Sequence, residues 1–300
     1  MRKALLCAAG LFICLVLCGQ VKILSVIGSS TAAGTGASAP DSAYLGRLNY
    51  YYNNLGITLT VYNLAQGGYD CYMGLPTSYI TNPPPGFTMH NQPDPNRNVT
   101  AALTFNPDVV LVHFPTNGYQ NLDWSIPHIV QCHQKIYDSV VALGKVCFIA
   151  TPQPRQDGGT FGTPESRQKL HLIRDSIMIQ FGNHAIDFWT GIALPDNTIN
   201  PIYSAGDNIH LNNAGHKELF KRVRDKDIFG LGLINRAINS GSWEDPLTWG
   251  NEYVPTIADS VVILPGKTVT INASTQVRAL YVHPTATLNI ASPAILKVGN

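Results

Sequence analysis

The sequence predicts an α/β domain with a parallel sheet, followed by a small all-β segment. Apolar runs rich in β-branched residues alternate with helix-like stretches over most of the 300 residues. The hydrophobic fraction of 45%, with 13% charged residues, suits a chain that buries a sizeable core. After about residue 235 the helix-like stretches stop, and short strand-like runs separated by turn residues follow one another.

Residues 1–19 have the organisation of a secretory signal peptide. Arg2 and Lys3 precede an apolar run that is too short to span a bilayer comfortably. We therefore expect bacterial export, to the periplasm or the surrounding medium. A lipoprotein signal at Cys18 is the alternative, although Leu17 stands where such signals have a small residue.

Residues 20–235 are expected to form the α/β domain. Its strands are predicted at Lys22–Gly28, Leu59–Ala65, Asp108–Pro115, Val146–Thr151 and, more weakly, Ala185–Trp189. Such apolar runs fit strands that are buried on both faces. Its helices are predicted at Asp41–Asn54, Ile126–Leu143, Glu165–Phe181 and Ala214–Arg224. Strands that alternate with helices imply right-handed crossovers and a parallel sheet covered on both sides.

Residues 236–300 contain an internal repeat. Pro265–Ile271 and Pro284–Ile290 are alike and define a period of about 19 residues, which suits the rungs of a β-solenoid. The preceding Ser240–Trp243 and Thr248–Gly250 resemble the entry of modules that begin right-handed β-helices in secreted bacterial proteins. We therefore expect a partial β-solenoid at this end.

Composition and spacing exclude several function classes. Lys and Arg number 20 against 19 Asp and Glu, and the net charge of +1 creates no field that would attract nucleic acid or anionic lipid. Beyond residue 19 the cysteines are Cys71, Cys132 and Cys147, which have no metal-ligand spacing and are expected to be buried thiols. We expect no cofactor, no metal, no nucleic-acid partner and no membrane span.

Two groups of polar residues are candidates for nucleophilic catalysis. Gly28–Gly34 follows the first predicted strand and carries two adjacent serines to the carboxyl edge of the sheet, where ligands bind in open α/β folds. It lacks the Gly-x-Ser-x-Gly pattern of ordinary α/β-hydrolases. Asp207 and His210, three residues apart, precede the last predicted helix. A histidine oriented by a carboxylate is the base that a serine nucleophile needs.

Together with Asn63–Gly68 and Pro115–Gly118, these residues resemble the four ordered sequence blocks of the SGNH (GDSL-type) hydrolases. The resemblance covers roughly residues 21–226 and implies a flavodoxin-like three-layer α/β/α domain. It implies that Ser30 is the nucleophile, with Ser29 as the rival candidate.

The same resemblance assigns His210 as the general base and Asp207 as the acid that orients it. The oxyanion would be bound by the Ser30 N–H, the Gly68 N–H and the Asn117 side chain, with Gly67 as the alternative to Gly68. Three departures from the family pattern, Ser29, Pro115 and Gly118, alter the surroundings of the oxyanion pocket but carry no proton transfer.

Further residues have weaker claims. Arg155 follows the fourth strand and could bind an anionic substrate group or form a surface ion pair. His113 and His128 are expected to be structural, and His216 is expected at the surface, with a place facing the site as the alternative. An aromatic set could form a sugar-stacking wall or belong to the core: Tyr69, Tyr72, Tyr119, Trp124 and Trp189.

The predicted function is that of a secreted serine esterase. Its expected substrates are O-acyl groups, above all O-acetyl groups, on extracellular carbohydrate, and Tyr69 is a candidate for contacting them. A thioesterase, lipase or lysophospholipase of the same fold is the alternative enzyme. A non-catalytic adhesive protein, whose C-terminal segment binds a surface polysaccharide, is the alternative from another class.

Overall fold

The computed structural model describes residues 20–79, 91–114, 117, 125–159 and 161–299. The chain divides into a larger unit, Val21–Asn54 with Thr58–Ile228, and a smaller unit that includes Phe229–Asn300. The expected signal segment, residues 1–19, lies outside the described residues. None of the described helices is both long and apolar enough to cross a membrane.

The larger unit is built on a five-stranded parallel sheet. Its strands are β1 (Val21–Gly28), β2 (Thr58–Asn63), β3 (Val109–His113), β4 (Val146–Ala150) and β5 (Ala185–Ile186). Their order is β2-β1-β3-β4-β5, and every neighbouring pair is parallel. This is the strand order of flavodoxin-like doubly wound folds. The strand predictions are confirmed, except that β5 is only two residues long.

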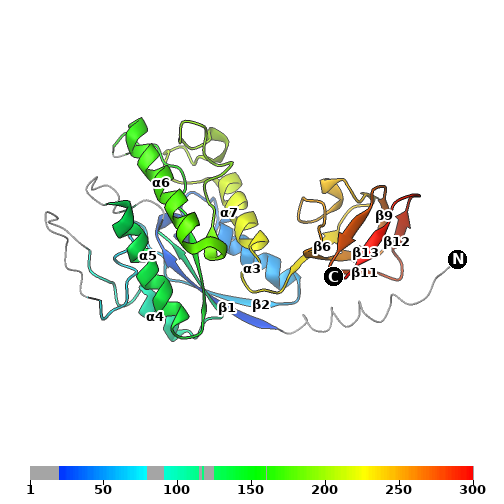
Figure 1. Cartoon of the computed structure of the whole chain (residues 1–300), viewed down its shortest axis with the longest axis horizontal. Coiled ribbons are helices and arrows are strands. Elements are labelled where there is room, and N and C mark those ends of the chain that lie inside the picture. The colour runs from blue at the N-terminus through cyan, green and yellow to red at the C-terminus, as the bar shows by residue number, and fades with distance from the viewer. Residues whose placement is uncertain (1–19, 80–90, 115–116, 118–124, 160, 300) are drawn as a thin grey trace. The chain divides into compact units, whose positions relative to one another are not determined.

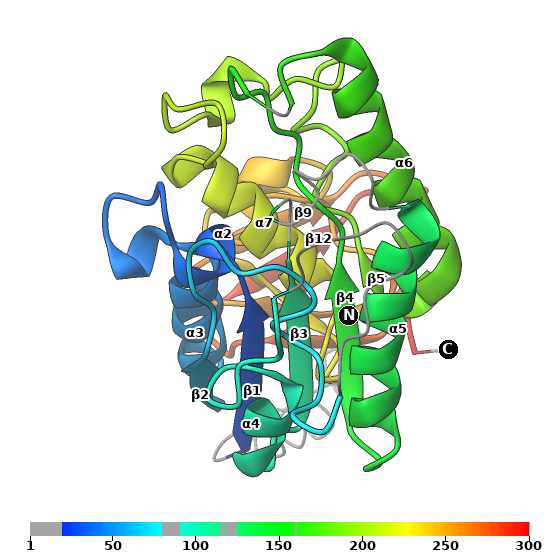
Figure 2. The same cartoon turned by 90° about the vertical axis from the view of Figure 1, so that its left-hand side faces the viewer.

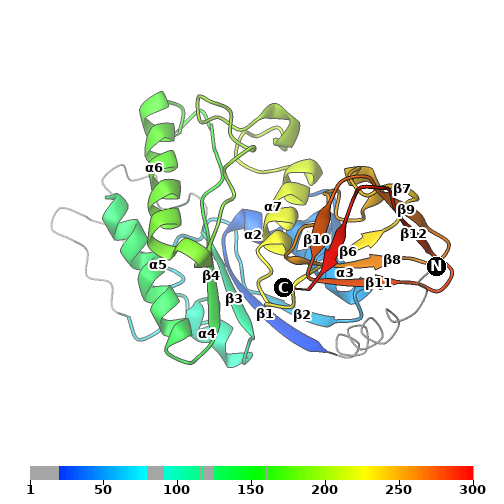
Figure 3. The same cartoon turned by 45° about the vertical axis from the view of Figure 1, so that its right-hand side comes forward.

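Helices cover both faces of this sheet. They are α2 (Ser30–Ala33), α3 (Tyr44–Asn54), α4 (Val99–Thr104), α5 (Ile126–Val141), α6 (Pro164–Phe181) and α7 (Asn213–Asp225), with 3-10 turns η1 (Pro40–Ser42), η2 (Gly182–His184) and η3 (Pro201–Tyr203). The helices α3 and α7 pack together on one side, and α4, α5 and α6 pack on the other (Figures 1 and 3). The sheet is therefore buried on both faces, which explains its apolar strands.

Capping side chains determine where several of the helices begin. Side chains of Ser125, Thr163 and Asn212 cap the first turns of α5, α6 and α7 by accepting backbone hydrogen bonds. The short helix α4 was not predicted, because its six residues directly follow residues 81–98, a part of the sequence rich in Pro and Asn. Its cap is Asn98, whose side chain accepts a hydrogen bond from Ala101 N at 3.0 Å.

The smaller unit holds three small parallel sheets. Its strands are β6 (Leu233–Ala237), β7 (Gly241–Ser242), β8 (Asp259–Ile263), β9 (Thr268–Ile271), β10 (Thr275–Val277), β11 (Ala279–Val282), β12 (Thr287–Ile290) and β13 (Leu296–Val298), with the 3-10 turn η4 (Pro246–Thr248). The sheet orders are β11-β8-β6, β12-β9-β7 and β10-β13. Because β6 pairs with β8, this unit begins before the boundary at residue 235 that the sequence suggested.

The register of these sheets follows the sequence repeat. Thr268 in β9 pairs with Thr287 in β12, so the two similar stretches lie side by side. Trp243 and Trp249 pack edge to face in the buried core of the unit, with ring centroids 4.8 Å apart, and Trp249 Nε1 donates to the Trp243 carbonyl at 2.8 Å. The tryptophans that open this segment are therefore core residues.

Candidate active site

The turn after β1 places Ser30 at the carboxyl edge of the sheet. Figure 2 shows α2 following directly from the end of β1. A Cβ on Gly28 would lie 2.3 Å from the His113 carbonyl oxygen, so only glycine permits this approach of β1 to β3. Ser29 N donates to the same oxygen at 3.0 Å. Ser30 is the first residue of α2 and is half-buried, whereas residues 24–29 before it are buried.

A short loop before α7 carries Asp207 and His210. The loop is closed by an antiparallel bridge between Ser204 and Leu211 and by Ala205 N, which donates to the His210 carbonyl at 2.9 Å. Asp207 Oδ1 accepts hydrogen bonds from Ile209 N at 2.9 Å and His210 N at 2.8 Å. This Asx-type turn fixes the carboxylate beside the imidazole that follows it.

The structure brings Ser30, His210 and Asp207 into one chain of contacts. His210 Nε2 lies 2.9 Å from Ser30 Oγ, although 180 residues separate them in sequence. His210 Nδ1 lies 2.5 Å from Asp207 Oδ2. With Nδ1 donating to the carboxylate, Nε2 carries the lone pair that can accept the serine proton. The three groups have the geometry of a serine nucleophile, its base and an orienting acid.

The Asp207 carboxylate is kept ionised by its hydrogen bonds. Partial burial acts to raise its pKa, but the hydrogen bonds from the His210 backbone, the His210 ring and the Ile209 backbone outweigh this and lower the pKa below the usual value. The side chains of Asp207 and His210 remain 45% and 18% exposed. The pair is therefore open to solvent on one side.

Two loops bring the oxyanion candidates to the same edge. Gly67 follows β2, and a Cβ placed on it would lie 3.8 Å from Ser30 Cβ. Gly68 has a φ of 85°, which glycine adopts without strain, so the backbone turns back at this point. Within the described residues, the N–H groups of Ser30 and Gly68 donate to no protein acceptor. Both are thus available to a bound oxygen.

Asn117 is held beside this turn by its own amide. Its Nδ2 group donates to the Tyr69 carbonyl at 3.2 Å and also to Ser29 Oγ. Ser29 is fully buried and contacts Asn117, whereas Ser30 contacts His210. The geometry therefore favours Ser30 over Ser29 as the nucleophile and gives Ser29 the role of a support for Asn117.

The two candidates for substrate binding have internal partners. Arg155 is only 5% exposed, its Nη2 lies 2.7 Å from Asp157 Oδ2, and its guanidinium lies over the Phe161 ring. An anionic substrate group would have to displace Asp157. The Tyr69 hydroxyl donates to Asp94 Oδ2 at 2.5 Å, and this hydrogen bond, with burial, raises the pKa of Tyr69.

The expectation that His216 lies at the surface is wrong. His216 is fully buried, stacks on Tyr44 and contacts the Thr35 carbonyl through Nε2 at 3.1 Å. Its position on α7, which packs against α3, explains this burial. His113 is buried as expected, 3.4 Å from the Tyr44 hydroxyl through Nδ1.

The other weaker candidates occupy structural positions or lie outside the described residues. His128 is half-buried, and its Nδ1 contacts Ser125 Oγ at 2.8 Å in the cap of α5. Trp189 belongs to the buried core of the larger unit, and Tyr72 is partly buried and packs against that core. Neither residue forms an exposed wall. Tyr119 and Trp124 lie outside the described residues. Cys71, Cys132 and Cys147 are free and buried, as expected.

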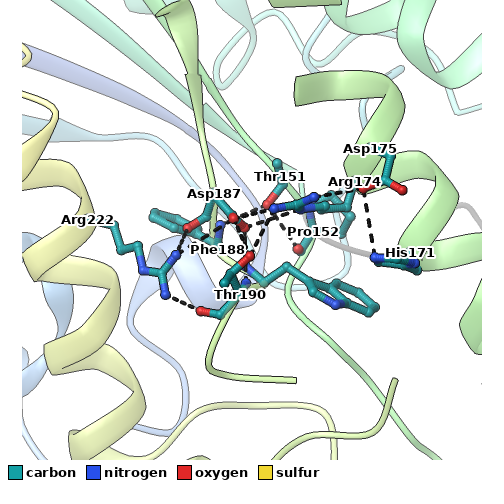
Figure 4. Close-up of polar contacts among 10 residues, drawn as sticks. Thr151, Pro152, His171, Arg174, Asp175, Asp187, Phe188, Thr190 and Arg222 are labelled. Atoms are coloured by element: carbon teal, nitrogen blue, oxygen red, sulfur yellow. Dashed lines mark hydrogen bonds and ion pairs between the residues drawn. The ribbon is translucent and has the colours of Figure 1, made fainter. Parts of the chain in front are cut away.

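A polar network beside the end of β5 connects α7 to α6. Figure 4 shows Asp187, just after β5, between Arg174 of α6 and Arg222 of α7. Arg174 Nη2 contacts Asp187 Oδ2 at 2.5 Å, and Arg222 Nη1 donates to the Asp187 carbonyl at 2.9 Å. Burial acts to raise the pKa of Asp187, but hydrogen bonds from Arg174 and Thr190 bring it down to about 2. The network fixes the helix that follows the His210 loop.

Gln153 was not among the candidates predicted from the sequence. This residue follows β4 and is 2% exposed, and its Nε2 donates to Thr31 Oγ1 at 2.7 Å and to the Ile209 carbonyl at 3.0 Å. The signal was a polar residue shortly after a buried strand, but the charge of Arg155, two positions later, was the more conspicuous feature.

Comparisons with known proteins identify the family of the larger unit. A family model described as GDSL-like lipase/acylhydrolase matches residues 26–218. A protein assigned to the G-D-S-L lipolytic family from Desulfitobacterium hafniense superposes with a TM-score of 0.50 and 13% identity, covering 68% of this chain and 99% of its own. No curated protein matches the sequence.

Two further solved structures are similar to a lesser degree. One is assigned as an acylhydrolase from Bacteroides fragilis, with a TM-score of 0.49, 11% identity, and coverage of 75% of this chain and 97% of its own. The other is a two-domain esterase active on acetylated mannans, with a TM-score of 0.47, 15% identity, and coverage of 75% of this chain and 54% of its own. These scores are too low to carry an argument about substrate.

Proposed function

Because the chain belongs to the GDSL-like lipase/acylhydrolase family and is a hydrolase of ester bonds, we propose that it is a serine esterase in which Ser30 is the nucleophile. His210 is the general base, and Asp207 orients it. The observation that carries this proposal is the 2.9 Å contact between His210 Nε2 and Ser30 Oγ, with Asp207 on the opposite ring nitrogen.

The proposed reaction has two halves. His210 Nε2 takes the Ser30 proton while Ser30 Oγ attacks the ester carbonyl carbon, and His210 then gives the proton to the departing alcohol. A water molecule, deprotonated by His210, attacks the acyl-enzyme and releases the acid and the free Ser30 hydroxyl. The Asp207 carboxylate stabilises the imidazolium that forms in each half.

The N–H groups of Ser30 and Gly68 and the Asn117 amide form the proposed oxyanion hole. The two backbone donors support this because they have no acceptor within the described residues. Asn117 would shift one hydrogen from Ser29 or Tyr69 toward the oxyanion as negative charge develops there. Tyr69 and Arg155 stay proposed substrate contacts, with the condition that a substrate displaces Asp94 or Asp157.

The proposed substrates are O-acyl groups, above all O-acetyl groups, on extracellular carbohydrate. The support comes from the signal-like residues 1–19, which predict export, and from the C-terminal unit. We propose that its three small parallel sheets, with the pairing Thr268 to Thr287, are the first rungs of a β-solenoid. Solenoids present long surfaces that suit polymeric ligands.

A substrate screen tests this proposal. Wild type and Ser30→Ala would be incubated with acetylated polysaccharides, and released acetate would be measured. We expect acetate release from at least one polysaccharide by wild type and none by Ser30→Ala. A series of p-nitrophenyl esters separates the alternatives, because a preference for long acyl chains would favour a lipase or thioesterase. Equal activity of both proteins would contradict the role of Ser30.

A further inference from the structure

Gln153 lies between the two chain segments that supply the proposed nucleophile and base. It is 2% exposed and lies three residues after the end of β4. Its Nε2 group donates to Thr31 Oγ1 at 2.7 Å and to the Ile209 carbonyl at 3.0 Å. Thr31 is the neighbour of Ser30, and Ile209 is the neighbour of His210. One amide group therefore contacts the residue next to each reacting side chain.

The orientation of this amide follows from its partners. The Ile209 carbonyl can only accept a hydrogen bond, so Nε2 and not Oε1 must face it. The two amide hydrogens are then used by Ile209 and Thr31, and the Thr31 hydroxyl acts as acceptor. Gln153 thus restrains both segments at a fixed separation, and a shorter or apolar side chain could not do so.

A second contact from the same loop supports this arrangement. Gln156 N donates to the Asn208 carbonyl at 2.9 Å, so the chain that follows β4 also holds the His210 loop through its backbone. Farther along, His216 and Asn213 of α7 contact Thr35 and Ser38. These ties would keep the segments together without Gln153, so its removal should alter the geometry and not the fold.

We infer that Gln153 is a positioning residue that sets the distance between Ser30 Oγ and His210 Nε2. The inference rests on the proposed function, because it assumes that this pair performs the proton transfer. Ser30 and His210 lie near opposite ends of the larger unit's sequence, 180 residues apart. Their contact therefore depends on how the two loops are held. Misplacement by about 1 Å can cost about 100-fold in rate.

The test compares Gln153→Met with Gln156→Met. Methionine keeps the length of the side chain but has no N–H donors. Gln156 has an exposed side chain and bonds the His210 loop only through its backbone, so the same change there is a matched control. For p-nitrophenyl acetate we expect kcat of Gln153→Met to fall by about 10- to 100-fold with KM within about twofold. Gln156→Met should keep wild-type values.

A second readout separates positioning from loss of folded protein. A neutral phosphonate ester reacts with the serine only when His210 can accept its proton, and we expect its rate constant with Gln153→Met to fall by the same factor as kcat. The reaction amplitude, which counts competent sites, should stay that of wild type. A reduced amplitude with an unchanged rate constant would overturn the inference, because it would show partial unfolding.

Thr31→Val provides a milder variant of nearly equal volume that removes one of the two contacts. We expect a smaller fall in kcat, and no further fall when it is combined with Gln153→Met, because both changes act on one link. Unchanged kcat in Thr31→Val and Gln153→Met, with Ser30→Ala inactive, would overturn this inference alone. Activity that survives Ser30→Ala would instead overturn the proposed function.

Discussion

Replacement of Asp207 by asparagine tests the proposed triad at its most exposed member. Asp207 Oδ1 accepts two backbone hydrogen bonds, from Ile209 and His210, so the amide oxygen of asparagine would take that position and the loop would keep its shape. The amide NH2 group would then face His210 Nδ1, which becomes an acceptor. The ring proton must move to Nε2, the atom that should receive the Ser30 proton.

The expected loss follows from this wrong tautomer. Comparable changes cost about 10,000-fold in kcat, or roughly 5.5 kcal/mol of transition-state stabilisation. Because the Asp207 side chain is 45% exposed, solvent offsets part of the lost charge, and we expect about 1,000-fold, or roughly 4 kcal/mol. KM should change little, since Asp207 contacts the base and not the substrate.

The assay is steady-state hydrolysis of p-nitrophenyl acetate, with Asp196→Asn as control. Asp196 forms a similar turn, accepting from Thr198 N at 3.2 Å and Thr198 Oγ1 at 2.7 Å, but it lies before η3 and outside the His210 loop. We expect wild-type kcat for the control. A kcat of Asp207→Asn within about tenfold of wild type would refute the assigned role of the carboxylate.

Three further predictions concern the oxyanion pocket, acid stability and the network at β5. Asn117→Ala should lower kcat by about 100- to 1,000-fold without a matching rise in KM, and a fall below about threefold would argue against an oxyanion donor. Burial lowers the pKa of His113 to about 3, so the unfolded chain binds the proton first as pH falls below about 6.5. Urea titrations should therefore show that stability falls by about 2 kcal/mol at pH 5 relative to pH 7.5 through this residue, and that His113→Gln loses this part of the slope. Asp187→Ala removes the 2.5 Å contact with Arg174, which keeps only its more exposed partner Asp175 and Thr190. It should lower the free energy of unfolding by about 2 kcal/mol, which an unchanged urea midpoint would contradict.

Much of the fold could be predicted because its signals are local. The five β-branched runs became the five strands of the parallel sheet, and the 19-residue repeat reappears in the pairing of β9 with β12. The helix α4 could not be predicted from the sequence, because its six residues show too little hydrophobic periodicity to be distinguished from the preceding loop. The smaller unit begins before residue 235, the boundary that the sequence suggested, because β6 is defined by its pairing with β8, which lies later in the sequence.

By itself, the sequence determined which residue types stand at the carboxyl ends of the strands, and hence the family and the order of its blocks. Only the tertiary structure decided which of them meet: Ser30 with His210, Ser29 with Asn117, Arg155 with Asp157, and Gln153 with both loops. It also turned His216 inward, where the sequence suggested solvent. The physical reason is that strand and helix patterns record burial along one element, whereas these contacts join residues brought together by the crossovers of the sheet.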